Sequence, residues 1–361
     1  MEIAEAFPGL AWGECIVQPT SVPPAIKAEV KKAIGVVPGW VDRMAANPWL
    51  VRAFSRFGQK RVAHVPPALT DLITLVVSQD NSCRYCFGVQ HALLRVLGYD
   101  QGYIDRLERD FHVADLTPAQ RAALDFARKI SRANPRVGPR EFAELAKHGF
   151  TPPAIAEIAA LAAMSVFHNR VATVLALPPE ALETMVDQRL FKMLRPLIAW
   201  RMRRQPVPPE PAPRSSDRPC AAVVAALDGS PAAGAFRDVI DDAWASNALP
   251  RRTKALMLAV VARALGCPAT EREARDLAVR EGVGSETIDE VLATLGSREL
   301  DAREAALVPF ARDTVRAQPE ALQRRLREVT NGAGAETILE VAGTVALANA
   351  VCRLTVLLDL C

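Results

Sequence analysis

The sequence predicts an all-α protein built from two tandem helical bundles. Alanine and leucine are abundant, whereas aromatic residues make up only 6% of the 361 residues, and this composition favours packed helices over sheets. Apolar residues recur with helical spacing, and no segment alternates apolar and polar residues around hairpin turns. The chain also repeats itself along its length, which indicates two copies of one bundle.

The repeat keeps its register over most of the chain. Three pairs of segments match at the same offset of 184 positions: Val65–Pro67 with Leu249–Arg251, Cys83 with Cys267, and Phe126–Arg128 with Phe310–Arg312. Near the C-terminus the offset becomes 183, which pairs Arg170 with Arg353. A single small deletion explains the shift, so we interpret the repeat as a duplication.

The helices of the first copy follow from local signals. Four apolar residues lie at the spacing i, i+3, i+4, i+7 of an amphipathic helix that begins at the preceding prolines: Leu69, Leu72, Ile73 and Val76. The next helix contains FGVQHALLRVLG and ends at Gly98. Thr117 is the expected N-cap of another helix, with Pro118 in its first turn. Residues 154–177 are alanine-rich and apolar nearly all round, which predicts a central helix.

The predicted boundaries place the first copy at residues 1–204, a spacer at 205–219 and the second copy at 220–361. The spacer is proline-rich and polar, which predicts an extended segment. The segment before it, RLFKMLRPLIAWRMRR, has six basic and no acidic residues, and Pro196 interrupts its pattern. It is either a helix for a membrane surface or an acidic partner, or a solvated helix end whose Leu, Ile and Trp dock on the body. The second interpretation is favoured.

Charge and cysteine usage limit the function classes. The net charge of +3 gives no argument for nucleic acid. The N-terminus has no basic region ahead of an apolar run, and no charge-free apolar stretch reaches 18 residues, so neither a targeting segment nor a membrane span is expected. Seven cysteines with one close pair do not form a secreted disulfide scaffold. We therefore expect a cytoplasmic protein.

The close cysteine pair is the sharpest chemical feature. Cys83 and Cys86 lie three residues apart at the start of a predicted helix, with Arg84 between them. Helix N-termini and such pairs are settings that lower a thiol pKa, so the motif indicates a redox dithiol. Two other interpretations stay open: half-buried small hydrophobes, or half of a zinc site to which His91 and His168 would contribute. A thioredoxin fold needs a βαβ context, which this sequence lacks.

The motif and its surroundings resemble a known family. SQDNSCRYCFGVQHALLRVLG, followed by LTPAQRAALDFARKI, is similar to the AhpD-like branch of the carboxymuconolactone decarboxylase superfamily. The resemblance covers residues 22–187 well and residues 220–361 weakly. It implies an all-helical fold whose relatives pack as symmetric oligomers through their long helices. Two fused AhpD-like bundles are therefore expected to form an internal pseudo-dimer, and the chains to associate as a trimer or dimer.

The resemblance also implies roles for the first copy's residues. Cys86 would attack a peroxide, while Cys83 would resolve it to a disulfide and meet an external dithiol reductant. Asp71 stands where the family has Glu, and Gln90 stands where it has His. A histidine, His91, follows one position later and is turned about 100° further round the helix. His168 is another candidate base, and no metal or organic cofactor is required.

The second copy departs from the family pattern. Thr270 stands in the place of Cys86, and Ala255 in the place of Asp71. We therefore expect no dithiol there, and a degenerate copy that supplies an interface. Cys267 is expected to be a half-buried residue, and Cys352 and Cys361 have no motif around them.

The resulting hypothesis is a thiol-dependent peroxidase or disulfide oxidoreductase, an AhpD-like alkylhydroperoxidase with one active dithiol per chain. Its partners would be a peroxide and an external dithiol. Two alternatives are a decarboxylase-type lyase, since the superfamily contains lactone decarboxylases that do not rely on the pair, and a non-catalytic helical scaffold or redox sensor.

Overall fold

The computed structural model describes residue 7 and residues 10–112, 114–203, 218–316 and 318–360. Within these residues the regular elements are helices, and none is a strand. The predicted all-α class is therefore confirmed. The predicted spacer at 205–219 lies almost entirely outside the described residues.

The first half of the chain begins with three helices before the predicted bundle. These helices and those of the bundle are α2 (Pro24–Ile34), α3 (Trp40–Met44), α4 (Pro48–Gly58), α5 (Pro67–Asp80), α6 (Arg84–Val96), α7 (Gln101–Arg109), α8 (Pro118–Arg132), α9 (Pro139–Lys147), α10 (Pro152–Leu175), α11 (Ala181–Met185) and α12 (Arg189–Arg203).

The second half repeats the order of the bundle. Its helices are α13 (Ala221–Ala225), α14 (Pro231–Ala245), α15 (Arg251–Ala264), α16 (Pro268–Arg280), α17 (Ser285–Thr294), α18 (Ala302–Asp313), α19 (Pro319–Val329), α20 (Ala335–Leu354) and the short 3₁₀ helix η1 (Thr355–Leu360). Helices α15 and α16 begin 184 positions after α5 and α6 and have the same lengths, 14 and 13 residues. The element order thus follows the sequence repeat.

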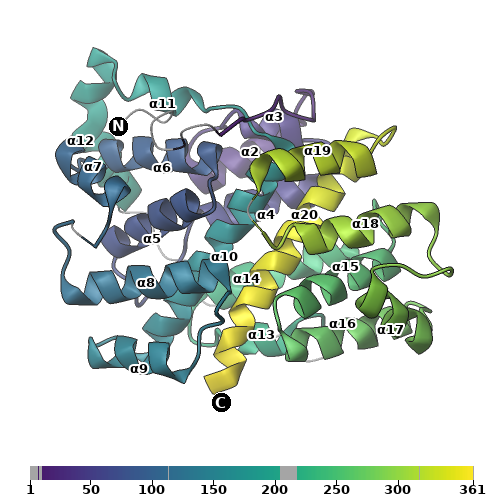
Figure 1. Ribbon diagram of the computed structural model, residues 1–361. Coiled ribbons are helices and arrows are strands. Elements are labelled where there is room, and N and C mark those ends of the chain that lie inside the picture. Colours follow the sequence, from purple (N-terminus) through teal and green to yellow (C-terminus); the bar gives the residue numbers. More distant parts are fainter. Residues whose placement is uncertain (1–6, 8–9, 113, 204–217, 317, 361) are drawn as a thin grey trace.

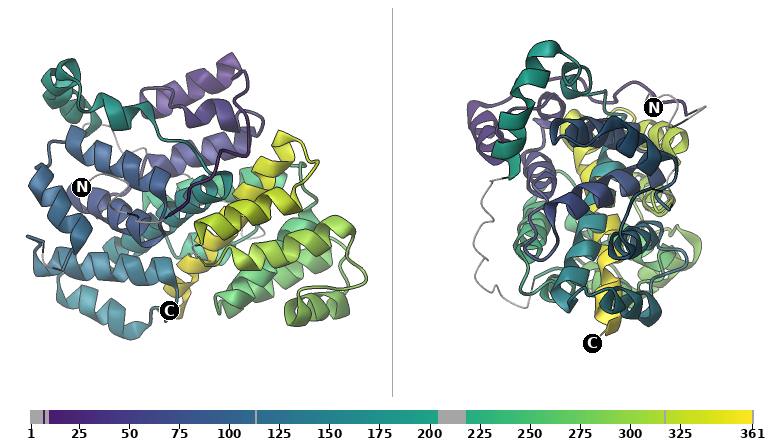
Figure 2. Two further views of the ribbon diagram at one scale, coloured as in Figure 1. Left: turned by 45° about the horizontal axis from the view of Figure 1, so that its top comes forward. Right: turned by 90° about the vertical axis from the view of Figure 1, so that its left-hand side faces the viewer.

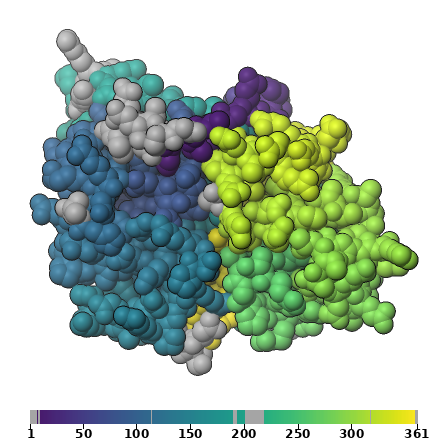
Figure 3. All heavy atoms as spheres, in the orientation of Figure 1, coloured from purple at the N-terminus to yellow at the C-terminus, as the bar shows by residue number. Residues whose placement is uncertain are grey.

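The long helices α10 and α20 pack against each other at the centre of the molecule. In Figure 1, α20 crosses the middle, with the first half on one side and the second half on the other, and Figure 2 shows the same arrangement from two further directions. The space-filling view shows the two halves meeting along a broad seam (Figure 3). Both helices are long and apolar enough to cross a membrane, but 94% of each apolar window is buried inside the structure. The fold uses them as its core.

Local signals set the helix boundaries as predicted. Thr117 caps α8 by accepting from the Gln120 N–H over 3.2 Å, and the Gln120 side chain accepts from the Thr117 N–H over 2.9 Å. Gly98 follows the end of α6 with φ of +90°, a conformation that favours glycine. Helix α5 begins with Pro67, and its apolar stripe is buried.

Two buried arginines join the halves reciprocally. Arg170 on α10 donates to the carbonyl oxygen of Thr314 in the second half over 2.7 Å. Arg353 on α20 donates to the carbonyl oxygen of Ser131 in the first half over 2.7 Å. Both guanidinium groups also donate to the Val315 carbonyl oxygen, over 3.2 and 3.4 Å. This reciprocal pattern is what a two-fold related pair of bundles produces.

Helix α12 corrects one expectation. Its Leu197 and Trp200 keep 62% and 52% of their surface exposed, so they are not buried in the body. Ile198 packs against the small cluster that contains Val96 and Val186, and Ala199 is buried. Pro196 lies inside the helix and does not end it. The predicted docking was therefore wrong for most of the apolar side chains.

Candidate functional site

The cysteine pair lies at the turn that joins α5 to α6. Cys83 is the N-cap of α6, and its sulfur accepts a hydrogen bond from the Cys86 N–H over 3.4 Å. Asn81 fixes this turn, since its side chain donates to the Ser131 hydroxyl over 2.7 Å. The Asn81 side-chain oxygen accepts from the Arg170 guanidinium over 3.0 Å. The central helix therefore holds the turn that carries both thiols.

Both thiols are free, and they differ in exposure. Cys83 is completely buried, whereas Cys86 keeps 9% of its surface exposed. Burial raises the pKa of Cys86 well above its ordinary value, and its hydrogen bond with Cys83 raises it further. The lowered thiol pKa expected from the helix N-terminus is thus not found at Cys86, because the cost of burying the thiolate is larger.

A lysine that the sequence did not indicate lies beside the pair. The positive charge of Lys60 lowers the pKa of Cys86, in opposition to burial. Burial in turn lowers the pKa of Lys60, whereas Asp71 and Cys86 raise it. The Lys60 ammonium donates to the Gln90 side-chain oxygen over 2.8 Å. Lys60 therefore interacts with three residues that the sequence analysis discussed: Asp71 and Cys86 through charge, and Gln90 through a hydrogen bond.

The backbone holds Lys60 in an uncommon conformation. Its φ is +46°, in the left-handed region, directly after helix α4. The segment that follows is anchored by the buried Glu157 of α10, whose carboxylate accepts from the backbone N–H groups of residues 63–65 over 2.6–3.0 Å. No periodicity or motif marks Lys60, since it lies in an irregular segment 23 positions before Cys83.

Gln90 links helix α6 to Asp71 on α5. The Gln90 amide donates to the backbone oxygen of Asp71 over 3.3 Å, which ties α6 to α5. Gln90 lies one turn after Cys86 on the same helix and is buried. The Asp71 charge acts on Lys60 and raises its pKa. The carboxylate therefore bears on Cys86 through Lys60.

The two candidate histidines are engaged elsewhere. A ring nitrogen of His91 lies 2.6 Å from a carboxylate oxygen of the buried Glu108. The ring nitrogens of His168 lie 2.8 and 2.9 Å from the carbonyl oxygens of Met164 and Phe54. Burial lowers the pKa of His168, and the nearby charge of Lys60 lowers it further. Both rings are therefore held by partners other than the thiols.

Tyr85, between the two cysteines, adds a second contact that sequence reasoning missed. Its hydroxyl donates to Glu180 over 3.0 Å, and the same carboxylate accepts from the backbone N–H groups of Gly39 and Trp40 over 3.0 and 3.1 Å. Burial raises the pKa of Tyr85, and Glu180 raises it further. Tyr85 therefore ties the start of α6 to the segment before α11 and to the start of α3.

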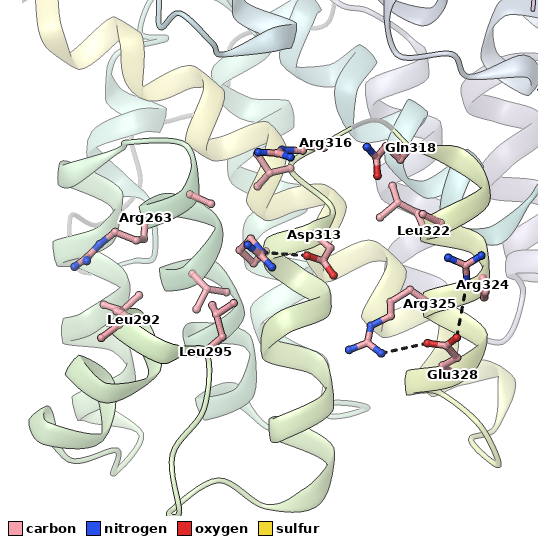
Figure 4. Close-up of a pocket in the computed structure, with 16 residues that line it drawn as sticks. Arg263, Leu292, Leu295, Asp313, Arg316, Gln318, Leu322, Arg324, Arg325 and Glu328 are labelled. Atoms are coloured by element: carbon pink, nitrogen blue, oxygen red, sulfur yellow. Dashed lines mark hydrogen bonds and ion pairs between the residues drawn. The ribbon is translucent and has the colours of Figure 1, made fainter.

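The other two candidate kinds of site are a metal site and an open cleft. Within the described residues, no group of three or more His, Cys, Asp or Glu side chains is arranged to hold a metal ion. A cleft of about 760 Å³ lies between α15, α17, α18 and α19 of the second half. Figure 4 shows Arg263, Arg316 and Arg325 on its walls, with Leu292 and Leu295 between them. No first-half residue lines it, so this cleft is separate from the dithiol.

Residues 222–313 match the carboxymuconolactone decarboxylase family. The predicted family resemblance is confirmed. The match falls on the second half, where the motif resemblance was weaker, and it spans α14 to α18, the helices equivalent to α4–α8. No curated protein matches the chain.

Several solved structures are similar to about half of the chain. An alkylhydroperoxidase AhpD core protein from Ralstonia eutropha JMP134, described as uncharacterised and peroxidase-related, is 28% identical; the match covers 48% of this chain and 97% of that one, with a TM-score of 0.43. A peroxidase-related protein from Silicibacter sp. TM1040 is 27% identical over 47% and 96%, with a TM-score of 0.41. The debrominase Bmp8 is 24% identical over 48% and 96%, with a TM-score of 0.42.

Proposed function

We propose that this protein is a thiol-dependent peroxidase or disulfide oxidoreductase that uses the Cys83–Cys86 dithiol. The observation that carries the proposal is the placement of two free thiols at one helix N-terminus with the Lys60 ammonium beside the more exposed one. Resemblance to the carboxymuconolactone decarboxylase family supports an AhpD-like activity. A reducing compartment such as the cytoplasm suits a chain whose described cysteines are free thiols.

The first step in the proposal oxidises Cys86. The Cys86 thiol first gives up its proton, and the thiolate then attacks one oxygen of the hydroperoxide. The O–O bond breaks, and the departing alkoxide takes up the released proton and leaves as an alcohol. Cys86 becomes a sulfenic acid. Lys60 stabilises the thiolate by its charge, and Asp71 keeps Lys60 protonated by raising its pKa. This arrangement assigns the proton relay to Asp71 and Lys60, because His91 and His168 are held by other partners.

The second step forms the disulfide. The Cys83 thiol attacks the Cys86 sulfur, an S–S bond forms, and water leaves. An external dithiol then attacks Cys86, because Cys83 is completely buried. Cys83 departs as a thiolate that the Cys86 N–H and the helix N-terminus stabilise. This order differs from the role implied by the family resemblance, in which Cys83 meets the reductant.

Peroxide consumption in the presence of a small dithiol tests the proposal. The wild-type chain is expected to consume an organic hydroperoxide catalytically, and Cys86→Ser to consume none. Without the small dithiol, Cys83→Ser is expected to consume one equivalent of hydroperoxide and to keep a sulfenic acid on Cys86, whereas the wild-type chain forms the disulfide. Turnover of a muconolactone by chains with blocked thiols would instead support the lyase alternative. Reaction with neither compound would leave the non-catalytic scaffold.

A further inference from the structure

The second half contains a thiol pair that no sequence motif indicated. Cys267 precedes the first residue of α16, at the position equivalent to Cys83, and Cys352 lies near the end of α20. The Cys267 thiol donates to the Cys352 backbone oxygen over 3.1 Å, and the two thiols are near enough that each affects the pKa of the other. Thr270 still excludes a Cys-x-x-Cys pair at the start of α16, but Cys352 brings a second thiol to Cys267 from another helix. The two cysteines are 85 positions apart in the sequence, so no local motif reveals the pair.

Residues of both halves surround the pair. Arg136, from the first half, donates to the Gly266 carbonyl oxygen over 2.5 Å and to the Thr355 hydroxyl over 2.8 Å. The Thr355 hydroxyl in turn donates to the Cys352 carbonyl oxygen over 2.7 Å. Arg136 thus fixes the backbone next to each cysteine. The guanidinium of Arg353, adjacent to Cys352 in sequence, adds a second buried positive charge.

These surroundings shift the pKa values of the two thiols in opposite directions. The hydrogen bond from Cys352 lowers the pKa of Cys267 to about 7 against the opposing effect of burial, and Thr355, Arg136 and Arg353 contribute in the same direction. Burial raises the pKa of Cys352, and the nearby Cys267 and Cys220 raise it further. One readily ionised thiol beside one protonated thiol is the arrangement of an attacking and a resolving cysteine.

A small cavity gives access to both sulfur atoms. It measures about 10 Å³, and its lining includes Cys267, Cys352, Arg136 and Lys129. This volume is close to the least that holds one water molecule. Lys129 is about half exposed, so the cavity lies just beneath the surface. An oxidant as small as hydrogen peroxide is close to this size, whereas a protein dithiol is far too large.

We propose that Cys267 and Cys352 form a second redox pair that hydrogen peroxide converts to a disulfide. The Cys267 thiolate attacks one peroxide oxygen, the O–O bond breaks, and the hydroxide that leaves is protonated to water. The Cys352 thiol then attacks the Cys267 sulfenic acid, an S–S bond forms, and a second water leaves. Two thiols are oxidised and one peroxide is reduced. The bond would join the start of α16 to α20, the helix that packs on α10. Peroxide would thus cross-link two helices of the second half next to its junction with the first half.

Cysteine mapping in the full chain tests this pair separately from the first dithiol. A Cys83→Ser/Cys86→Ser variant is reduced, treated with a small excess of hydrogen peroxide and alkylated after denaturation. We expect mass spectrometry to find a Cys267–Cys352 linked peptide in most chains, while Cys15 stays alkylated. Chains in which Cys267 and Cys352 both remain alkylated, or in which Cys352 is linked to Cys220, would overturn the proposal. Because the variant lacks the first dithiol, this result is independent of the peroxidase proposal.

Two single substitutions in the same background sharpen the test. Cys352→Ala is expected to leave a sulfenic acid on Cys267 that a dimedone-type reagent traps. Cys220→Ala removes the other nearby thiol and is expected to leave the linked peptide unchanged, so it is the matched control. Loss of the linked peptide in Cys220→Ala, with helicity retained by circular dichroism, would contradict the assignment. Should Cys352→Ala fail to fold, the mapping of the parent variant still decides.

Discussion

At the scale of single residues, the protonation of Cys86 governs the proposed chemistry. Burial raises its pKa and Lys60 opposes that rise. The thiolate, which is the reactive form, is therefore less populated at neutral pH than in a free thiol with a pKa of about 8.5. Lys60, which opposes the effect of burial on the Cys86 pKa, is therefore as important to the reaction as the cysteine itself.

The pH dependence of Cys86 alkylation checks this balance. Because the pKa is raised, we expect the alkylation rate to keep rising with pH beyond about 8.5, where an exposed thiol would level off. Site-resolved mass spectrometry separates Cys86 from Cys267, whose lowered pKa predicts ionisation at lower pH. A Cys86 profile that levels off below pH 8 would mean that burial does not dominate.

Substitution of Lys60 tests its role directly. Lys60→Met removes the positive charge beside Cys86, so the reaction with peroxide is expected to slow by about 10²-fold, the usual effect of losing one preorganised stabilising group. The alkylation profile of Cys86 should move to higher pH at the same time. Lys60→Arg should restore part of the rate, and the exposed Lys147→Met is the matched control. An unchanged rate and profile in Lys60→Met would remove Lys60 from the site.

The sequence predicted some of these residues and missed others for one physical reason. Cys83 and Cys86 are close in sequence and lie at a helix start, so a local motif reveals them. Lys60 and Cys352 reach their sites only through tertiary packing. The partners that hold His91 and His168, Glu108 and the Phe54 carbonyl oxygen, likewise follow from tertiary packing.

At the scale of helices, the central pair α10 and α20 supports both thiol sites. Apolar periodicity predicted α10 as a central helix, and its burial confirms this. Periodicity did not show that Glu157 and Arg170 on this helix hold the segment after Lys60 and the turn before Cys83. The docking of α12 also depended on tertiary packing, which explains why that expectation was wrong.

Arg170 offers a test of this helix-level support. Arg170→Met removes this donor from the buried oxygens of Asn81 and Thr314, while the Val315 carbonyl oxygen keeps Arg353 as a donor. Each buried acceptor left unsatisfied costs about 1–3 kcal/mol, so the urea midpoint of unfolding is expected to fall clearly. The exposed Arg272→Met is the control and should leave the midpoint unchanged. Equal midpoints in the two variants would show that the buried guanidinium adds no net stability.

At the scale of the whole molecule, the two halves depend on each other. Each long helix is covered by the other, and the buried arginines bond across the junction. Family resemblance suggested this internal pseudo-dimer, whereas the thiol pair at Cys267 follows only from the packed structure. Association of whole chains as a trimer or dimer remains a prediction, which light scattering would check.

Expression of residues 1–205 alone tests the dependence. Without the second half, the apolar face of α10 that packs on α20 would be exposed to water, and large exposed apolar patches drive association. We expect the fragment to aggregate or to pair with itself in size-exclusion chromatography. A soluble, stable monomer with full thiol reactivity would show that the second half is not a required partner.

The central claim is that Cys86 is the thiol that attacks peroxide. The most direct measurement treats the full-length Cys83→Ser variant with one equivalent of an organic hydroperoxide in the presence of a dimedone-type reagent and locates the adduct by mass spectrometry. The account predicts an adduct on Cys86, with none on Cys83 in the reciprocal Cys86→Ser variant. Absence of the adduct from Cys86, or equal labelling of Cys83 and Cys86 in the two variants, would contradict it.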